Sequence, residues 1–306
     1  MTGILHVPFA EGEACLDWLD FCEALAAGHS LPKAEVADSF LYRGKDTLLS
    51  RSAWIDGLGI AVKNATVFPG NPDQGIPMIN GGLSLYDDAT GVFEASIDFH
   101  LVTKWKTAGD SLLGALRLAN PDSTSILIVG AGTVAASLIE AFSAGYPAAQ
   151  INVWNRTLSK AETLASAYPS TNVEPDLEQA VRRADIIVTC TMSSTPVIQG
   201  DWLQPGQHLN MIGAYRPDMR EADDTALQRG MIYCDSFDTT LDHIGEFKIP
   251  IAEGTIVAED VRADFYNLES FPEYDPAQIT LFKNGGGAHL DLMTSRHILD
   301  RWSQTR

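Results

Sequence analysis

The stretch SILIVGAGTVAA, residues Ser125–Ala136, joins an apolar strand pattern to a glycine-rich turn and then to a helical pattern. Gly130, Gly132 and Ala135 fit the G-x-G-x-x-G/A spacing of a dinucleotide-binding turn. There the glycines permit a tight bend and close approach of the backbone to a pyrophosphate at the positive helix N-terminus. The stretch predicts a bound dinucleotide, with a purely structural turn as the alternative. The turn residues expected to contact it are Gly130, Ala131, Gly132, Thr133 and Val134.

The end of the next apolar stretch, VWNRT at Val153–Thr157, indicates which dinucleotide is bound. An NAD-binding chain usually places Asp or Glu there for the adenosine ribose, whereas an Arg accommodates the 2′-phosphate of NADP. Here Asn155, Arg156 and Thr157 occupy the position, and no carboxylate follows until Glu162. A guanidinium and a hydroxyl bind phosphate well. The sequence favours NADP(H) as the cofactor, with NAD(H) as the alternative.

The composition is that of an ordinary globular protein, with 45% hydrophobic and 20% charged residues among 306. The formal net charge of −19 would repel nucleic acid and anionic membranes, so neither is predicted as a partner. No stretch approaches the roughly 18 apolar residues of a membrane span, and the first residues lack a secretion-signal pattern. The four cysteines show no metal-ligand spacing, which predicts reduced thiols in the cytoplasm and no metal site.

A turn at residues 120–122 divides the chain, and strand and helix patterns alternate after it. This alternation predicts an α/β fold of the Rossmann type, with a doubly wound parallel sheet. Helices are expected at 11–27, 98–119 (one long helix or two), 159–168, 176–184 and 288–302. Strands are expected at 46–51, 59–67, 82–87, 125–129, 151–154, 185–191 and 208–213. Ligands bind outside the carboxyl ends of such parallel strands, so Thr191, Met192 and Gly213 are candidate contacts of the nicotinamide.

Two lysines in the first part of the chain stand in unusual surroundings. Lys63 lies within the apolar strand pattern of residues 59–67, where an unpartnered ammonium would be costly to bury. Lys106 lies near the expected start of a long helix, two residues after Lys104. Each is an ordinary surface lysine or a group that faces an anionic ligand. The loop after residue 67, rich in Gly, Pro and Asn, favours the ligand for Lys63.

Several motifs occur in a characteristic order, from about residue 46 to residue 292. They read AVKNATVFPGNPDQGIP, LYDDATG, TKWKTAGDS, IVGAGTVA, WNRT, NMIGAYRPDMREAD and ITLFKNGGGAHLDL. In this order the chain resembles the ornithine cyclodeaminase/μ-crystallin family. The resemblance implies a homodimer whose subunit has an NAD(P)-binding Rossmann domain, here residues 119–283. It also implies a discontinuous α+β domain for substrate binding and dimerisation, here residues 1–118 completed by 284–306. Members transfer hydride at the α-carbon of small amino or imino acids.

The resemblance also implies roles for individual residues. Lys63 matches the active-site lysine, and is expected to be catalytic. Lys106 matches a position that is usually arginine and that binds the substrate carboxylate, and Thr107 follows it as a candidate cofactor contact. A further arginine of the family has no counterpart here, where Asp38 or Ser39 falls near its expected position. Arg43 and Arg51 are its possible substitutes, of which we prefer Arg51 as a substrate-binding residue.

One departure from the family decides between its reactions. Cyclodeaminases resemble one another in an Asp two residues after the glycine of the MIGA motif, where it serves as a base; this chain has Tyr215, a candidate substrate contact. A phenol accepts a proton poorly from an ammonium at neutral pH, and reduction of a preformed ketimine needs no such base. We therefore expect NADPH-dependent reduction of a cyclic ketimine acid, Δ1-pyrroline-2-carboxylate or Δ1-piperideine-2-carboxylate, to the L-imino acid.

Two alternatives stay open. One is an ornithine cyclodeaminase with another base, such as Asp218 acting through water, or an amino-acid dehydrogenase. The other is a non-catalytic protein of the μ-crystallin type that binds NADPH and a small ligand.

Overall fold

The computed structural model describes residues 4–306, which form two compact units. The first unit contains the chain up to Lys106 together with Gly287–Arg306, and the second contains Thr107–Gly286. The division falls within helix α3, Phe99–Leu118, and therefore earlier than the boundary after residue 118 indicated by the sequence. The reason is packing, because Gly114 in the later part of α3 lies directly against the Phe282 ring of the second unit.

The first unit is built on a six-stranded sheet with the order β1-β6-β5-β4-β3-β2. Its strands are β1 Leu5–Val7, β2 Glu35–Arg43, β3 Asp46–Ile55, β4 Gly59–Val67, β5 Ile79–Tyr86 and β6 Phe93–Ile97. Strands β2 to β6 form an antiparallel meander, and β1 joins β6 in parallel. The pairing of β3 with β4 places Arg51 opposite Lys63. Two residues that the sequence analysis singled out separately are therefore neighbours on adjacent strands.

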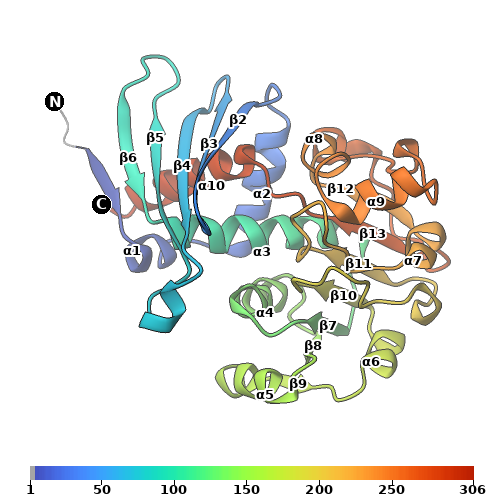
Figure 1. Ribbon diagram of the computed structural model, residues 1–306. Coiled ribbons are helices and arrows are strands. Elements are labelled where there is room, and N and C mark those ends of the chain that lie inside the picture. The colour runs from blue at the N-terminus through green and yellow to red at the C-terminus, as the bar shows by residue number, and fades with distance from the viewer. Residues whose placement is uncertain (1–3) are drawn as a thin grey trace. The chain divides into compact units, whose positions relative to one another are not determined.

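The helices of this unit come from both the N-terminal and the C-terminal part of the chain. They are α1 Phe9–Glu13, α2 Trp18–His29 and α10 Ala288–Ser303, with a 3-10 turn η1 at Asn71–Gln74. Helix α10 packs against β3, β4 and α2 (Figure 1). The single helix expected at 11–27 was wrong, because Asp17 begins a new helix: its carboxylate accepts hydrogen bonds from the backbone N–H groups of Leu19 and Asp20.

The second unit contains a seven-stranded sheet in which every pair of neighbours is parallel, with the order β12-β13-β11-β10-β7-β8-β9. The strands are β7 Ser125–Val129, β8 Gln150–Trp154, β9 Thr171–Val173, β10 Ile186–Thr189, β11 His208–Met211, β12 Met231–Cys234 and β13 Thr280–Lys283. The chain leaves β7 toward β8 and β9, and then returns to β10 on the other side. This reversal beside β7 is the switch point at which doubly wound sheets bind their ligands.

Helices and short turns connect these strands. The helices are α4 Thr133–Gly145, α5 Leu158–Ala167, α6 Leu177–Arg183, α7 Asp224–Arg229, α8 Phe237–Thr240 and α9 Gly245–Glu253. The 3-10 turns are η2 Gly200–Trp202, η3 Ala258–Asp260 and η4 Phe265–Ser270. The sequence-based prediction of an α/β, doubly wound parallel sheet is confirmed.

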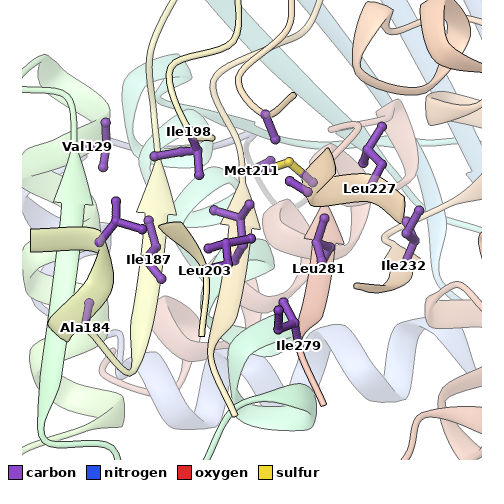
Figure 2. Packing of buried hydrophobic residues seen from close by; sticks show 14 of the residues in the cluster. Val129, Ala184, Ile187, Ile198, Leu203, Met211, Leu227, Ile232, Ile279 and Leu281 are labelled. Carbon is purple, nitrogen blue, oxygen red and sulfur yellow. The ribbon is translucent and has the colours of Figure 1, made fainter. Parts of the chain in front are cut away.

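The core of the second unit explains why its strands read as continuous apolar runs. Val129, Ile187, Met211 and Leu281 come from four different strands and lie side by side on one face of the sheet (Figure 2). Their side chains are fully buried. Parallel strands covered by helices on both faces need apolar residues at successive positions, as Ile126–Val129 supply. This packing fixes the strand ends from which the candidate site projects.

No helix within residues 4–306 is both long and apolar enough to cross a membrane.

Candidate functional site

The glycine-rich turn follows β7 directly and has the backbone that a dinucleotide site requires. Gly130 has φ +131°, a conformation that favours glycine, and a Cβ there would lie 2.7 Å from the Cys190 Sγ atom. Gly132 begins α4 in an extended conformation, with no side chain capping the helix. A Cβ at Gly132 would meet nothing within 4 Å, so the space in front of the helix N-terminus is open. This cradle fits a pyrophosphate.

The remaining residues of the turn are accessible. Thr133 and Val134 are exposed at the first turn of α4, and Ala131 is partly buried. The N–H groups of a first helical turn have no partner within the helix, so they are available to a bound anion. The turn therefore presents donors to the position that a phosphate group would take.

The end of β8 presents Asn155, Arg156 and Thr157 next to this turn in the sheet order. Asn155 donates a hydrogen bond of 2.8 Å from Nδ2 to the backbone oxygen of Thr157, which orders the connection to α5. Arg156 and Thr157 are exposed. The arrangement offers a guanidinium and a hydroxyl to an anionic group.

The loops after β10 and β11 meet at a buried glutamate that sequence reasoning missed. Glu221 accepts hydrogen bonds from the backbone N–H of Thr191 (2.7 Å) and from its hydroxyl (2.8 Å). It also accepts from the backbone N–H groups of Gly213 (2.7 Å) and Ala214 (3.2 Å). Its side chain is fully buried. One carboxylate thus joins both loops that the sequence assigned to the nicotinamide.

Two further candidates project from these loops. Met192 and Tyr215 expose 66% and 56% of their surface. Tyr215 lies beside Arg216, whose guanidinium carbon is 5.8 Å from the ring centre. Arg216 in turn holds Asp218 through two bonds of 2.9 and 3.0 Å. The Arg216 hydrogen bond keeps the pKa of Asp218 below its ordinary value, which makes this carboxylate a weaker base.

In the first unit, Lys63 and Lys106 meet at one carboxylate, that of Asp291 on α10. The distances from Asp291 Oδ1 are 2.9 Å to Lys63 Nζ and 2.7 Å to Lys106 Nζ. Lys63 also donates to the Thr103 hydroxyl at 2.8 Å and lies 4.7 Å from the centre of the Phe99 ring. All three charged side chains are buried. Both lysines, predicted separately, therefore belong to one cluster.

The charges of this cluster shift one another's titration. Burial alone would raise the pKa of Asp291, but the charges of Lys106, Lys63 and Arg51 outweigh it and hold this pKa at about 2. Burial lowers the pKa of Lys106 to about 7, with Lys63 and Arg51 acting in the same direction and Asp291 opposing them. Asp291 therefore stays ionised at neutral pH, whereas Lys106 gains or loses its proton near neutral pH.

Arg51 completes the cluster from β3. It pairs with Asp38 of β2 at 2.6 Å, and its charge acts on Asp291. When Lys106 is protonated, three cations (Arg51, Lys63, Lys106) and two carboxylates (Asp38, Asp291) leave a net charge of one positive unit. Arg43, the other possible substitute, instead pairs with Asp46 at the exposed end of the β2–β3 hairpin. The cluster is suited to one monovalent anion.

Thr107 is partly buried on α3 as the first residue of the second unit. Within residues 4–306, no three His, Cys, Asp or Glu side chains gather as metal ligands would.

The sequence analysis missed Asp291 and Glu221, although each left a signal in the sequence. Asp291 is a lone acid in the largely apolar run AHLDL, and Glu221 is an acid followed by the apolar Ala222 in MREAD. Each signal gains meaning only through partners distant in sequence.

Comparison with known proteins places the chain in a family. The family described as "Ornithine cyclodeaminase/mu-crystallin family" matches residues 54–306. The chain belongs to this family. The expected resemblance is thereby confirmed.

Two relatives and one solved structure are similar to the chain. A Delta(1)-pyrroline-2-carboxylate reductase of Paracoccus denitrificans is 46% identical over 298 residues, 95% of this chain and 94% of its own. The ketimine reductase mu-crystallin of Rattus norvegicus is 32% identical, covering 80% of this chain and 76% of its own. The fold is that of Thermococcus litoralis Delta(1)-pyrroline-2-carboxylate reductase, solved with NADH and L-proline. That comparison has a TM-score of 0.89 at 22% identity, over 99% of this chain and 98% of the other. This family member is an oxidoreductase.

The two glycines of the turn give opposite predictions. We expect Gly130→Ala to lower the free energy of unfolding by about 1–3 kcal/mol, because its backbone conformation and Cys190 both oppose a Cβ. We expect Gly132→Ala to leave unfolding nearly unchanged but to weaken NADPH binding roughly tenfold or more, because the methyl group enters the open cradle. Urea unfolding and NADPH fluorescence titration measure the two effects. Unchanged NADPH affinity in Gly132→Ala would argue against the dinucleotide turn.

Removing the shared carboxylate of the lysine cluster should cost stability. We expect Asp291→Asn to lower the free energy of unfolding by about 3–5 kcal/mol, because it leaves two buried ammonium groups without their counter-ion. The matched control is Asp300→Asn, an exposed residue on the same helix, for which we expect a change within about 0.5 kcal/mol. Equal effects of the two substitutions on urea unfolding would refute this role of Asp291.

Proposed function

We propose that this enzyme reduces a cyclic ketimine acid, Δ1-pyrroline-2-carboxylate or Δ1-piperideine-2-carboxylate, to the L-imino acid with NADPH. The observation that carries the proposal is the absence of a suitable base in the loop after β11. Tyr215 stands where cyclodeaminases of the family are expected to have an aspartate. Asp218, the other candidate, is bound by Arg216 and has a lowered pKa. Reduction of a preformed ketimine needs no base at this position.

The buried cluster supports an anionic substrate. Lys63, Lys106 and Arg51 are the groups we assign to the substrate carboxylate, and with Lys106 protonated their net charge with Asp38 and Asp291 matches one carboxylate. The Paracoccus denitrificans relative at 46% identity is named for a substrate with one such group. We further assign to Lys63 delivery of a proton to the ring nitrogen. Binding and orientation by these side chains contribute much of the lowering of the barrier.

The second unit supports a nicotinamide dinucleotide. We assign Gly130, Ala131, Gly132, Thr133 and Val134 to its pyrophosphate and Asn155, Arg156 and Thr157 to its adenosine end. When bound, this cofactor supplies the hydride. Exposed Arg156 and Thr157 support NADPH as the preferred form, since both groups bind phosphate well. We assign Thr107, Thr191, Met192 and Gly213 to the remaining contacts of the cofactor.

We also propose that the protein is a cytoplasmic homodimer. Strand β2 lies at the edge of its sheet, and Phe40, Leu41 and Tyr42 expose 50%, 67% and 72% of their surface. An apolar edge strand of this kind invites pairing with another copy. Sedimentation at micromolar concentration should give the dimer mass, and a monomer mass would refute the assembly. Residues 4–306 contain no disulfide, in keeping with a reducing compartment.

The activity is tested by following NADPH oxidation with the two ketimine acids. We expect turnover with at least one of them and none with L-ornithine and NAD⁺. We expect Lys63→Met to lower kcat/KM by at least about a hundredfold, because it removes a carboxylate contact and a proton donor. Near-normal kcat/KM in this variant would refute the role of Lys63. Binding of NADPH without turnover of any imino acid would favour the non-catalytic alternative.

The cofactor preference has its own control within this assay. A parallel NADH series should give a lower kcat/KM than NADPH in the wild type. Arg156→Ala should raise the KM for NADPH and leave that for NADH nearly unchanged, since only NADPH carries the 2′-phosphate. Equal effects on both cofactors would contradict the assignment of Arg156.

The pKa of Lys106 predicts a pH dependence of anion binding. Lysine is charged below its pKa, so the affinity for a carboxylate should fall as pH rises through about 7. Pyrrole-2-carboxylate is a suitable probe, because its carboxyl group stays ionised from about pH 6 to 9. An arginine keeps its charge over this range, so the Lys106→Arg variant should lose less affinity for this inhibitor as pH rises. The same decline in both proteins would show that another group is responsible.

A further inference from the structure

Glu221 has an unusual set of hydrogen bonds for a residue outside the predicted site. Its Oε1 atom accepts two bonds from Thr191 after β10, and its Oε2 atom accepts bonds from Gly213 and Ala214 after β11. Strong hydrogen bonds to a buried carboxylate are costly to remove, because the donors are then left without partners. One side chain therefore links the two loops at the ends of β10 and β11.

The two loops are also in direct contact. A Cβ on Gly213 would lie 2.0 Å from the backbone oxygen of Thr191, so only glycine permits this approach. The backbone oxygen of Glu221 accepts hydrogen bonds from the N–H groups of Val197 and Ile198, farther along the first loop, at 2.8 and 2.9 Å. Side chain and backbone of Glu221 thus hold the same two segments.

A second buried acid fixes the backbone of Glu221. Glu246, at the start of α9, accepts hydrogen bonds from the N–H groups of Glu221 (2.7 Å) and Ala222 (3.0 Å). Burial, followed by the charge of Glu221, raises the pKa of Glu246 to about 7. Near pH 7 the substitution Glu246→Gln therefore changes the charge only in part, which makes it the milder perturbation.

The sheet order tells which half of the cofactor these loops would meet. The glycine-rich turn and the end of β8, which we assign to the pyrophosphate and the adenosine end, lie to one side of the switch point. Strands β10 and β11 lie on the other side of β7. In a doubly wound sheet the two halves bind the two mononucleotides. The loops joined by Glu221 therefore belong to the nicotinamide half.

We infer that Glu221 is a positioning residue that sets the geometry of the nicotinamide-binding loops without contributing to binding of the adenosine half. The inference rests on the proposed use of NADPH. It assigns to the acid of the MREAD motif a role that acts through Thr191 and Gly213. An amide at this position would present an NH₂ group to at least one pair of donors, and would weaken the side-chain link to one loop.

The experiment compares binding of two probes to the full-length protein. NADPH engages both halves of the site, whereas adenosine 2′,5′-bisphosphate carries only the adenosine half. For Glu221→Gln we expect the Kd of NADPH to rise about tenfold or more, the factor that corresponds to one lost charge-assisted bond. The Kd of adenosine 2′,5′-bisphosphate should stay within about twofold of the wild type. Gly132→Ala is the comparator that should weaken both probes.

Kinetics and controls make the result decisive. The matched control Glu178→Gln changes an exposed acid of the same unit, paired with Arg182, and should leave both Kd values unchanged. Glu221→Gln should also lower kcat with the ketimine acid, whereas the KM for that substrate should change little. Unchanged NADPH affinity, or an equal loss of affinity for both probes, would overturn the inference.

A second variant covers the case in which Glu221→Gln does not fold. Glu246→Gln should then show the same selective loss of NADPH affinity to a smaller degree, because it loosens the backbone of Glu221. If Glu246→Gln binds both probes like the wild type, the inference is overturned. Failure of the wild type to bind NADPH would instead refute the proposed function.

Discussion

The buried ion pair network around Asp291 is the interaction on which the charged interior of the first unit depends. One oxygen atom binds the ammonium groups of Lys63 and Lys106, which come from β4 and α3, while Asp291 itself comes from α10. Without that carboxylate, two cations would share an interior from which water is excluded, an arrangement that proteins avoid. The network therefore permits a cationic site within a chain whose net charge is −19. The positive charge is confined to this cluster, whose lysines are held together in the interior.

A second buried carboxylate has the corresponding place in the other unit. Glu221 holds two loops where Asp291 holds two lysines, and both are fully enclosed acids bound by several donors. The two differ in what they leave available. Asp291 partly neutralises groups that we assign to the substrate, whereas Glu221 saturates backbone donors and fixes the shape of the loops. The buried acid of the first unit thus balances charge, and the buried acid of the second unit fixes the positions of two loops.

Sequence patterns predicted only part of each sheet. The expected strands correspond to β3, β4 and β5 of the first sheet and to β7, β8, β10 and β11 of the parallel sheet, whereas β1, β2, β6, β9, β12 and β13 were missed. Strands such as β7 are covered on both faces and appear as apolar runs, and the turn at Gly130 needs a residue type that stands out. Strand β2 is exposed along its whole length, so burial imposes no alternation on its sequence. It was missed for that reason. The break before α2 was missed because periodicity continued across Asp17, which acts as a cap only in the folded chain.

The site was predictable to the extent that its residues are local. Lys63 stood out as a cation in an apolar strand, and Gly130 and Gly132 stood out by spacing. Asp291 lies 228 positions from Lys63, and no short pattern connects the two. Glu221 is 30 positions from Thr191, which is likewise beyond any local periodicity. Partners brought together by tertiary structure have to be found in the structure.

The chain path of α10 has a consequence for the order of folding. The second unit is continuous from Thr107 to Gly286, but the first unit lacks a helix until residues 287–306 are made. During synthesis from the N-terminus, the dinucleotide-binding unit can therefore fold while Lys63 and Lys106 still lack their counter-ion. In a nascent chain, the unit to which we assign the cofactor can be complete before the cluster that we assign to the substrate has formed. The last helix, α10, is therefore the element that completes the first unit.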